Sequence, residues 1–291
     1  MSTLSASAPI RARIMGGINR DPLLVAGLLL FLLLLALSLF GPLLVDPALA
    51  DIGAVRARRA PSPEHWLGTD GQGRDMIAAL VVGLPQSLRI SLFAGVLGLM
   101  IGIVLGLTAA YFHGWVDVVI RTVSDVVMTI PGIAVLVLVA TNVRIMTVDL
   151  IGLIVASIAW MYPTRTIRAQ TLSIISRPYI DVARINAVGG LRLLATEVLP
   201  NLLPFIAASF VTGVSTALLA TIGLEALGLG PQNELTLGGI IYWAQYNGAI
   251  LRGMWWWWAP PVVLIALIFL SLLMISIGLD RLVNNRLSAS P

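Results

Sequence analysis

Long uncharged runs of apolar residues alternate with short charged segments along this chain. Four such runs occupy residues 22–45, 90–112, 198–224 and 255–279, and two shorter runs, at 126–143 and 150–163, each follow directly after an Asp. About 20 consecutive apolar residues suffice for a helix to cross the hydrocarbon core of a bilayer. The pattern therefore predicts an all-α polytopic membrane protein with six transmembrane helices.

The first run has two features of a secretory signal, because Arg residues precede it and Ala48-Leu49-Ala50 looks like a cleavage site. The apolar part of a signal is only about 7–15 residues long. This run is longer, so we expect an uncleaved anchor. The expected organisation is an N-terminal tail (1–21), a first transmembrane helix (22–45), an external loop (46–85), a core of five further transmembrane helices (86–281) and a C-terminal tail (282–291).

The positions of Arg and Trp predict the orientation of the spans. With six spans, both termini lie on the same side of the membrane. If that side is the cytoplasm, it also contains the segment 164–197 and most of the Arg residues, as expected from the excess of positive charge in cytoplasmic loops. Residues 255–258, all Trp, then anchor the outer start of the last span at the membrane interface. We expect a multi-pass protein of the plasma (inner) membrane with both termini cytoplasmic.

Composition supports the membrane assignment and argues against several classes of function. The chain of 291 residues is 58% hydrophobic and only 11% charged, whereas soluble domains have about 25% charged residues. All its cations are Arg, and they lie between apolar runs, so membrane topology accounts for the net charge of +4 better than nucleic-acid binding does. With no Cys and only two His, the sequence offers no catalytic set, no metal site and no cofactor site of its own.

Residues 178–188 have the signals of a short helix within the segment 164–197. Ser176 is a candidate N-cap, Pro178 suits the first turn, and Gly189-Gly190 favours termination. Asp181 and Arg184 are spaced i,i+3 and can pair. One face of this helix consists of Tyr179, Val182, Ala183, Asn186 and Ala187. That face suits packing against another protein, but a helix lying across the inner ends of the spans would show the same pattern.

Three glycines in the second span are spaced by four residues. Gly98, Gly102 and Gly106 form a strip of the kind that lets two helices approach closely. Helix packing is the role we expect for the strip, and a pore-facing role is the alternative.

Asp125 is the one carboxylate that the pattern places close to the middle of a span. Ionisable groups in the membrane are costly, which makes Asp125 a candidate for the translocation path. A structural i,i+4 pair with Arg121 near the inner interface is the other reading. Pro131 could kink the same helix, and that kink could be purely architectural.

The run YIDVARINAVGGLRLLATEVLPNLLP, residues 179–204, resembles the internal loop of binding-protein-dependent ABC import permeases. That family has a Glu-Ala-Ala triplet, a Gly shortly after it and a later Leu-Pro-Asn. Here Asp181-Val182-Ala183 takes the place of the triplet, Leu199-Pro200-Asn201 stands at the expected distance, and Ala187 replaces the Gly.

Two further segments narrow the resemblance. HWLGTDGQGRD, residues 65–75, and GLEALGLG, residues 223–230, are similar to segments of the peptide-and-nickel branch of these permeases, in the subunit called the C-type. Asp125, Ile130 and Pro131 fit the third span of that branch. The similarity covers most of the chain, from about His65 to Arg286.

The resemblance implies a type I ABC importer permease whose loop helix is a cytoplasmic coupling helix, held in a cleft of a separate ATPase subunit. Asp181 and Arg184 would set the register there, Ala183 and Ala187 would permit close approach, and Tyr179 would be an anchor. The full set of implied coupling residues is Tyr179, Asp181, Val182, Ala183, Arg184 and Ala187.

The resemblance also implies partners and a substrate class. The partners are a homologous B-type permease, two ATPase subunits or one fused ATPase that bind ATP and Mg, and an external substrate-binding protein. The substrates are di- or oligopeptides, with nickel chelates and glycosides as alternatives. The absence of Lys agrees with a separate ATPase, because the GxxxxGK[ST] phosphate loop needs a Lys. A second hypothesis, an ion-coupled secondary carrier, would need intramembrane carboxylates, and only Asp125 is available.

Overall fold

The computed structural model describes residues 21–186 and 189–288, and these residues form helices and connecting loops without a β-sheet. The long single helices are α2 (Pro22–Leu44), α3 (Met76–Phe112), α10 (Leu199–Ala226) and α12 (Trp255–Ser288). Shorter helices are α4 (Gly114–Thr129), α5 (Gly132–Thr141), α6 (Val148–Ala159), α7 (Met161–Ile175), α8 (Pro178–Ile185), α9 (Gly190–Leu193) and α11 (Leu237–Tyr246), with a 3-10 turn at Pro47–Ala50 and a π-helical turn at Leu194–Val198. The all-α membrane architecture expected from the sequence is confirmed.

Four continuous helical stretches among the described residues are long and apolar enough to cross a membrane. Two bent pairs, α4 with α5 and α6 with α7, bring the number of crossings to six if each pair counts as one span. The fifth of these crossings is the continuous stretch Gly190–Ala226, which joins α9, the π-helical turn and α10.

The third span differs from the expected run at 126–143. The helix begins earlier, at Gly114, and breaks at Ile130 and Pro131, after which α5 turns away from α4 by 81°. Ile130 has an extended backbone, with φ −83° and ψ 130°. Pro131 has no N–H to continue the helix and disfavours a helical conformation in the residue before it. The kink expected at Pro131 is therefore a complete break.

The fourth span is longer than the apolar run at 150–163. After a bend of 41°, α7 continues to Ile175, past two charged residues that ended the apolar run, Arg165 and Arg168. One side of α7 remains buried along this extension, where Thr164, Ile167 and Thr171 are inaccessible to solvent. A helix needs only one apolar face to pack, and the sequence signal of a continuous apolar run misses such a segment.

Carboxylates determine where two of the long helices begin. The Oδ1 atom of Asp21 accepts hydrogen bonds from the backbone N–H groups of Leu23 and Leu24, at 2.9 and 3.3 Å. Asp75 does the same for Ile77 and Ala78, at 2.9 and 3.0 Å. Such N-caps stabilise a helix by about 1 kcal/mol because they satisfy donors that have no partner within the helix.

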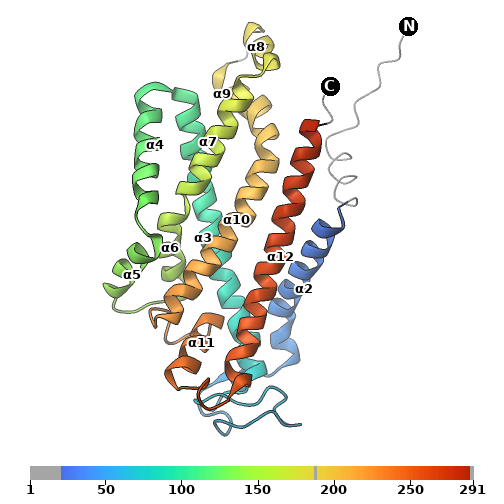
Figure 1. Cartoon of the computed structure of the whole chain (residues 1–291), viewed down its shortest axis with the longest axis vertical. Helices are drawn as coiled ribbons and strands as arrows, with labels where there is room; N and C mark the ends of the chain where they lie inside the picture. The colour runs from blue at the N-terminus through green and yellow to red at the C-terminus, as the bar shows by residue number, and fades with distance from the viewer. Residues whose placement is uncertain (1–20, 187–188, 289–291) are drawn as a thin grey trace, which may run out of the picture.

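Helix α3 runs through the middle of the bundle and contacts α2, α6, α7 and α10 (Figure 1). The glycine strip lies along its contact with α6 and α7. A Cβ atom placed on Gly98 would lie 2.7 Å from the Cβ of Ala159, and one on Gly102 would lie 2.5 Å from the Cβ of Pro163. The strip therefore faces helices of the same chain.

The two ends of the bundle differ in what they carry. Figure 1 shows α8 at the end where α2 begins and α12 ends, whereas α11 and the loop that precedes α3 lie at the opposite end. This arrangement agrees with the expected placement of the segment 164–197 on the same side as both termini. Which end faces the cytoplasm stays a prediction.

The loop before α3 is a folded cap held by internal hydrogen bonds. The Oδ1 atom of Asp70 accepts from the backbone N–H groups of Gln72 and Arg74, at 2.7 and 2.8 Å, and Trp256 of α12 donates its indole N–H to the carbonyl of Thr69 at 3.2 Å. Burial raises the pKa of the Asp70 carboxyl above its usual value, although these bonds and Arg74 act in the opposite direction. The cap therefore connects the start of α3 to the start of α12.

Candidate functional site

Helix α8 stands at one end of the molecule, between α7 and α9 (Figure 1). The sequence predicted this helix over 178–188, and the structure places it at Pro178–Ile185, with Ala187 and Val188 outside the described residues. Ser176, the expected N-cap, instead ends α7, where its hydroxyl donates to the carbonyl of Ser173 at 3.0 Å. The helix therefore begins at the expected residue, and Ile185 is its last residue in the part of the chain that the structure describes.

One side chain anchors α8 to the bundle. Ile180 is 0% exposed and belongs to an apolar cluster with Ile167 and Ile174 of α7, Val198 of the π-helical turn and Leu202 of α10. The predicted face of Tyr179, Val182, Ala183 and Asn186 did not include this residue. Ile180 therefore attaches the first turn of α8 to the bundle.

The opposite side of α8 exposes large apolar side chains. Tyr179 is 39% exposed, Val182 58% and Ile185 83%, and Asp181 on the same helix is also exposed. Ala183 is partly buried against the cluster below. Soluble surfaces rarely gather apolar side chains in this way unless another protein or a membrane covers them.

Tyr179 links α8 to the start of α10. The side-chain amide of Asn201 donates to the carbonyl of Glu197 at 2.7 Å and lies 3.4 Å from the hydroxyl of Tyr179. Partial burial raises the pKa of the Tyr179 hydroxyl, so this group stays protonated at neutral pH. Tyr179, the first residue of the 179–204 motif, and Asn201, near its end, thus lie close together.

The chain returns from α8 to α10 through a tight contact at Gly190. A Cβ atom on this residue would overlap the ring and hydroxyl of Tyr111, at the end of α3. Gly189-Gly190 was expected to end a helix, whereas Gly190 in fact begins α9. Glycine is needed at this position because the backbone passes directly against an aromatic ring.

Part of the predicted coupling set stays a prediction. The side chain of Arg184 and the whole of Ala187 lie outside what the structure describes. The expected pairing of Asp181 with Arg184 is therefore a hypothesis about α8.

A row of charged side chains joins α4 to α7 near the same end of the bundle. The Arg168 guanidinium donates two hydrogen bonds to the carboxylate of Asp117, one of them 2.6 Å long, and Arg165 lies 3.6 Å from Asp125. The cation that pairs with Asp125 thus comes from α7, whereas the sequence suggested Arg121 on α4. Arg121, Asp125, Arg165 and Arg168 border a cavity of about 160 Å³.

Comparison with known proteins identifies the family. Residues 98–289 match the family described as "Binding-protein-dependent transport system inner membrane component". The matched region begins within α3 and includes all of the helices from α4 to α12. This chain belongs to that family.

The relatives of this permease carry the names of peptide transporters. The dipeptide transport system permease protein DppC of Alkalihalophilus pseudofirmus is 30% identical over 217 residues, which cover 74% of this chain and 70% of the relative. The oligopeptide transport system permease protein OppC of Mycobacterium bovis is 29% identical, with coverage of 76% and 77%. The glutathione transport system permease protein GsiD of Pectobacterium atrosepticum is 32% identical, with coverage of 73% and 71%.

A solved structure supports the fold. A chain of the MetNI methionine ABC transporter, in inward-facing conformations, superposes with a TM-score of 0.58, covering 72% of this permease and 97% of that chain at 19% identity. The family as a whole consists of membrane components that work with ATPase and substrate-binding partners. The resemblance to C-type peptide permeases inferred from the sequence motifs is confirmed.

The structure also places a carboxylate that the sequence reading of this permease passed over. Glu225, near the end of α10, is 1% exposed, and its side chain packs against Gly230 and against Gly238 at the start of α11. Asp125, by contrast, is partly exposed. A signal was present in GLEALGLG, since glycines around a charged residue leave room for its side chain, but only the fold shows which of them face Glu225.

Among the described residues, His, Asp and Glu form no group of three or more that could hold a metal ion. His65 lies 2.8 Å from Asp75 in the folded cap, where the pair connects the loop to the N-cap of α3. The candidate functional site of the permease is the exposed apolar face of α8, a surface for contact with a partner.

Proposed function

We propose that this chain is the permease subunit of an ATP-driven importer of di- or oligopeptides, and that α8 is the helix through which separate ATPase subunits drive its transport cycle. ATP and Mg would bind to those subunits. An external binding protein would deliver the peptide, and a homologous B-type permease would form the other half of the path.

The observation that carries this proposal is the exposed apolar face of α8. Tyr179, Val182 and Ile185 project from the end of the bundle, outside the stretches long and apolar enough to cross a membrane. Lipid tails do not cover side chains in that position. A cleft in a partner protein would bury them, in the manner of a helix laid into a groove.

The anchoring of α8 supports its role as a lever. Ile180 packs on both α7 and α10, and Tyr179 lies within reach of Asn201. A force applied to α8 would therefore act on two membrane-spanning segments together. ATP binding would shift the equilibrium between inward-facing and outward-facing packings to the extent that the ATPase subunits favour one position of α8.

Peptides are the substrate class that the relatives favour, since dipeptide, oligopeptide and glutathione systems appear together among them. The alternative of an ion-coupled carrier depended on Asp125. That residue has Arg165 as an ion-pair partner, which favours a structural role in the contact between α4 and α7.

Val182→Arg tests the proposal. A charged side chain in the middle of an apolar interface without a partner would lower ATP-dependent peptide uptake by at least about tenfold, since the cost exceeds about 1.4 kcal/mol. The measurement is peptide uptake and ATP hydrolysis in vesicles, together with the amount of ATPase that co-purifies with the chain.

Leu251→Arg is the matched control, because Leu251 is 93% exposed but lies in the loop between α11 and α12, at the other end of the bundle. We expect normal membrane insertion for both variants and normal uptake for the control. Unchanged uptake and unchanged ATPase retention in Val182→Arg would refute the role of α8.

A further inference from the structure

A wedge-shaped groove opens between α2 and α12 in the half of the bundle next to the folded cap. In the other half the two helices touch. A Cβ atom placed on Gly27 of α2 would lie 2.8 Å from the Cβ of Met274 of α12, and one placed on Gly278 of α12 would lie 2.5 Å from the Cβ of Leu24 of α2. Nearer the cap, α2 packs on α3 instead, where a Cβ on Gly41 would lie 3.0 Å from Val81. The two helices therefore diverge, and α3 forms the floor between them.

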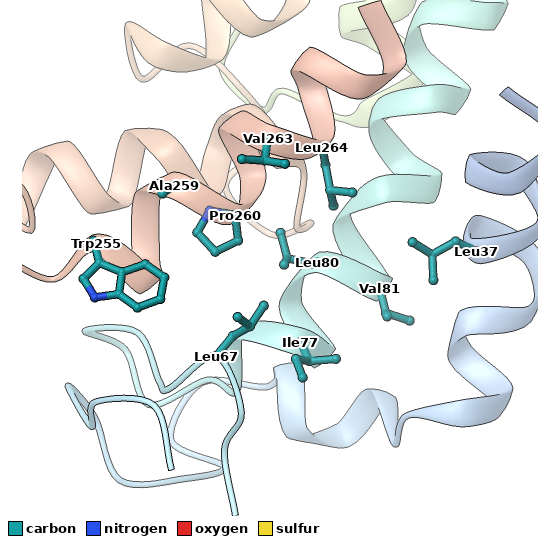
Figure 2. Close-up of a pocket in the computed structure, with 10 residues that line it drawn as sticks. All are labelled: Leu37, Leu67, Ile77, Leu80, Val81, Trp255, Ala259, Pro260, Val263 and Leu264. Carbon is teal, nitrogen blue, oxygen red and sulfur yellow. The ribbon is translucent and has the colours of Figure 1, made fainter. Parts of the chain in front are cut away.

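The walls of this groove consist of aliphatic side chains and the ring of Trp255. Figure 2 shows Leu37 of α2 on one side, Leu80 and Val81 of α3 below, and Pro260 and Leu264 of α12 on the other side. The groove has a volume of about 420 Å³, within the range of roughly 300–1,000 Å³ typical of small-molecule sites. The indole N–H of Trp255 is the one side-chain hydrogen-bonding group among the ten lining residues, so a peptide or a sugar would lose most of its hydrogen bonds there at a high cost.

The groove faces hydrocarbon, since both helices that form its rim, α2 and α12, are among the most apolar stretches of the molecule, each with a mean hydropathy of 3.0. The exposed side chains along the rim include Val263 and Trp255. A bilayer around α2 and α12 therefore brings acyl chains to the opening of the groove.

A hollow with two arginines lies in the cap, in the loop segment that contacts the end of the groove. Leu67 of the cap closes that end of the groove. The next residue, Gly68, lies between the backbone of Arg59 and the ring of Trp256. A Cβ atom placed on Gly68 would lie 2.5 Å from the carbonyl oxygen of Arg59 and 2.8 Å from the ring of Trp256. Arg56 and Arg59, together with Glu64 and His65, line a hollow of about 590 Å³ in the cap, so its two guanidinium groups outnumber its single carboxylate. The backbone contact between Gly68 and Arg59 thus places a segment with two arginines next to the residue that closes the groove.

We propose that the groove holds one acyl chain of a membrane phospholipid whose phosphate lies beside Arg56 and Arg59. A phospholipid joins an apolar acyl chain, which suits the groove, to an anionic phosphate, which suits the arginines of the cap. The helix of a partner subunit would meet the same apolar walls but would leave the two arginines without a role. The bound lipid fills the space where α2 and α12 separate and fastens the first helix to the rest of the bundle.

Photolabelling tests this site on the full chain in its native assembly. The protein is reconstituted in phosphatidylcholine vesicles with a small fraction of phosphatidylglycerol that carries a diazirine in one acyl chain, and the labelled peptides are quantified by mass spectrometry. We expect labels to concentrate on residues 77–81 and 259–264. Ala259→Phe fills the groove and lowers this labelling by about tenfold, the effect of removing roughly two methylene groups from their contacts.

Matched variants separate a specific site from general lipid contact. Leu270→Phe adds the same ring to an exposed part of α12 that does not line the groove, and it leaves the labelling unchanged. Val263→Phe is the second filling variant, at an exposed position that tolerates a larger side chain if Ala259→Phe fails to insert. Arg56→Gln with Arg59→Gln lowers labelling by the anionic probe, whereas Arg58→Gln, in the same loop but outside the hollow, does not.

Two outcomes would overturn the proposal. In the first, labels are spread along α2 and α12 in proportion to side-chain exposure, and Ala259→Phe does not change their amount. This result would show that lipid contacts the surface of the two helices without binding in the groove. Protection of 77–81 and 259–264 in the assembly, with labels appearing instead on a helix of another subunit, would show that a partner occupies the groove.

Discussion

At single glycines of this permease, the backbone lies directly against an aromatic or a charged side chain from another segment. Gly190 leaves room for the ring of Tyr111, and Gly238 leaves room for the carboxylate of Glu225. Both contacts join segments distant in sequence, so a methyl group at either position changes packing that a local reading of the chain does not reveal.

Gly238→Ala should destabilise the fold, because the new methyl group would overlap the Oε2 atom of Glu225, whose side chain is fully enclosed. We expect a loss of about 1–3 kcal/mol in the free energy of unfolding, measured by denaturation of the detergent-solubilised protein. In a Glu225→Ala background, Gly238→Ala should lower the free energy of unfolding by less. We expect the two substitutions to differ from additivity by about 0.5–3 kcal/mol. Additive effects of the two substitutions would contradict the contact.

Among the elements, α3 and the broken third span determine the shape of the bundle. The glycine strip brings α3 against the bend between α6 and α7, and Pro131 separates α4 from α5. The sequence indicated both features, since glycine spacing and proline positions are local signals. It did not indicate that α4 begins at Gly114 or that α7 extends to Ile175, because those segments are helical through packing on one face only.

Gly102→Ala tests the strip. A Cβ atom there would lie 2.5 Å from the Cβ of Pro163, and neither backbone can move easily inside the bundle. Thermal unfolding should show a destabilisation of about 1–3 kcal/mol. Gly213→Ala in α10 is the control, because its Cβ would meet nothing nearer than 3.8 Å. Equal stability of the two variants would mean that the strip does not limit the approach of the helices.

At the scale of the whole molecule, the two ends of the bundle are built for different neighbours. One end presents α8 with its apolar face, and the other presents the folded cap, α11 and the tryptophans at the start of α12 (Figure 1). The importer proposed above requires α8 to face the cytoplasm and the cap to face outward.

The absence of Cys makes that orientation directly measurable. Ile185→Cys and Leu251→Cys introduce single thiols at positions that are 83% and 93% exposed, at opposite ends of the bundle. A membrane-impermeant maleimide applied to intact cells should label the thiol at 251 and not the one at 185, and lysis should make both reactive. Labelling of the thiol at 185 in intact cells would place α8 outside and exclude contact with an ATPase.

The sequence by itself determined the class of this protein, the approximate positions of its spans, the start of α8 and the family, because each depends on apolar length, helix signals or motifs that are local in the chain. The tertiary structure decided which partner each side chain meets. It paired Asp125 with Arg165, buried Ile180 beneath α8, enclosed Glu225 beside Gly238 and opened the groove between α2 and α12. These contacts join residues far apart in the sequence, and hydrophobic periodicity says which face of a helix is apolar but not which helix will cover it.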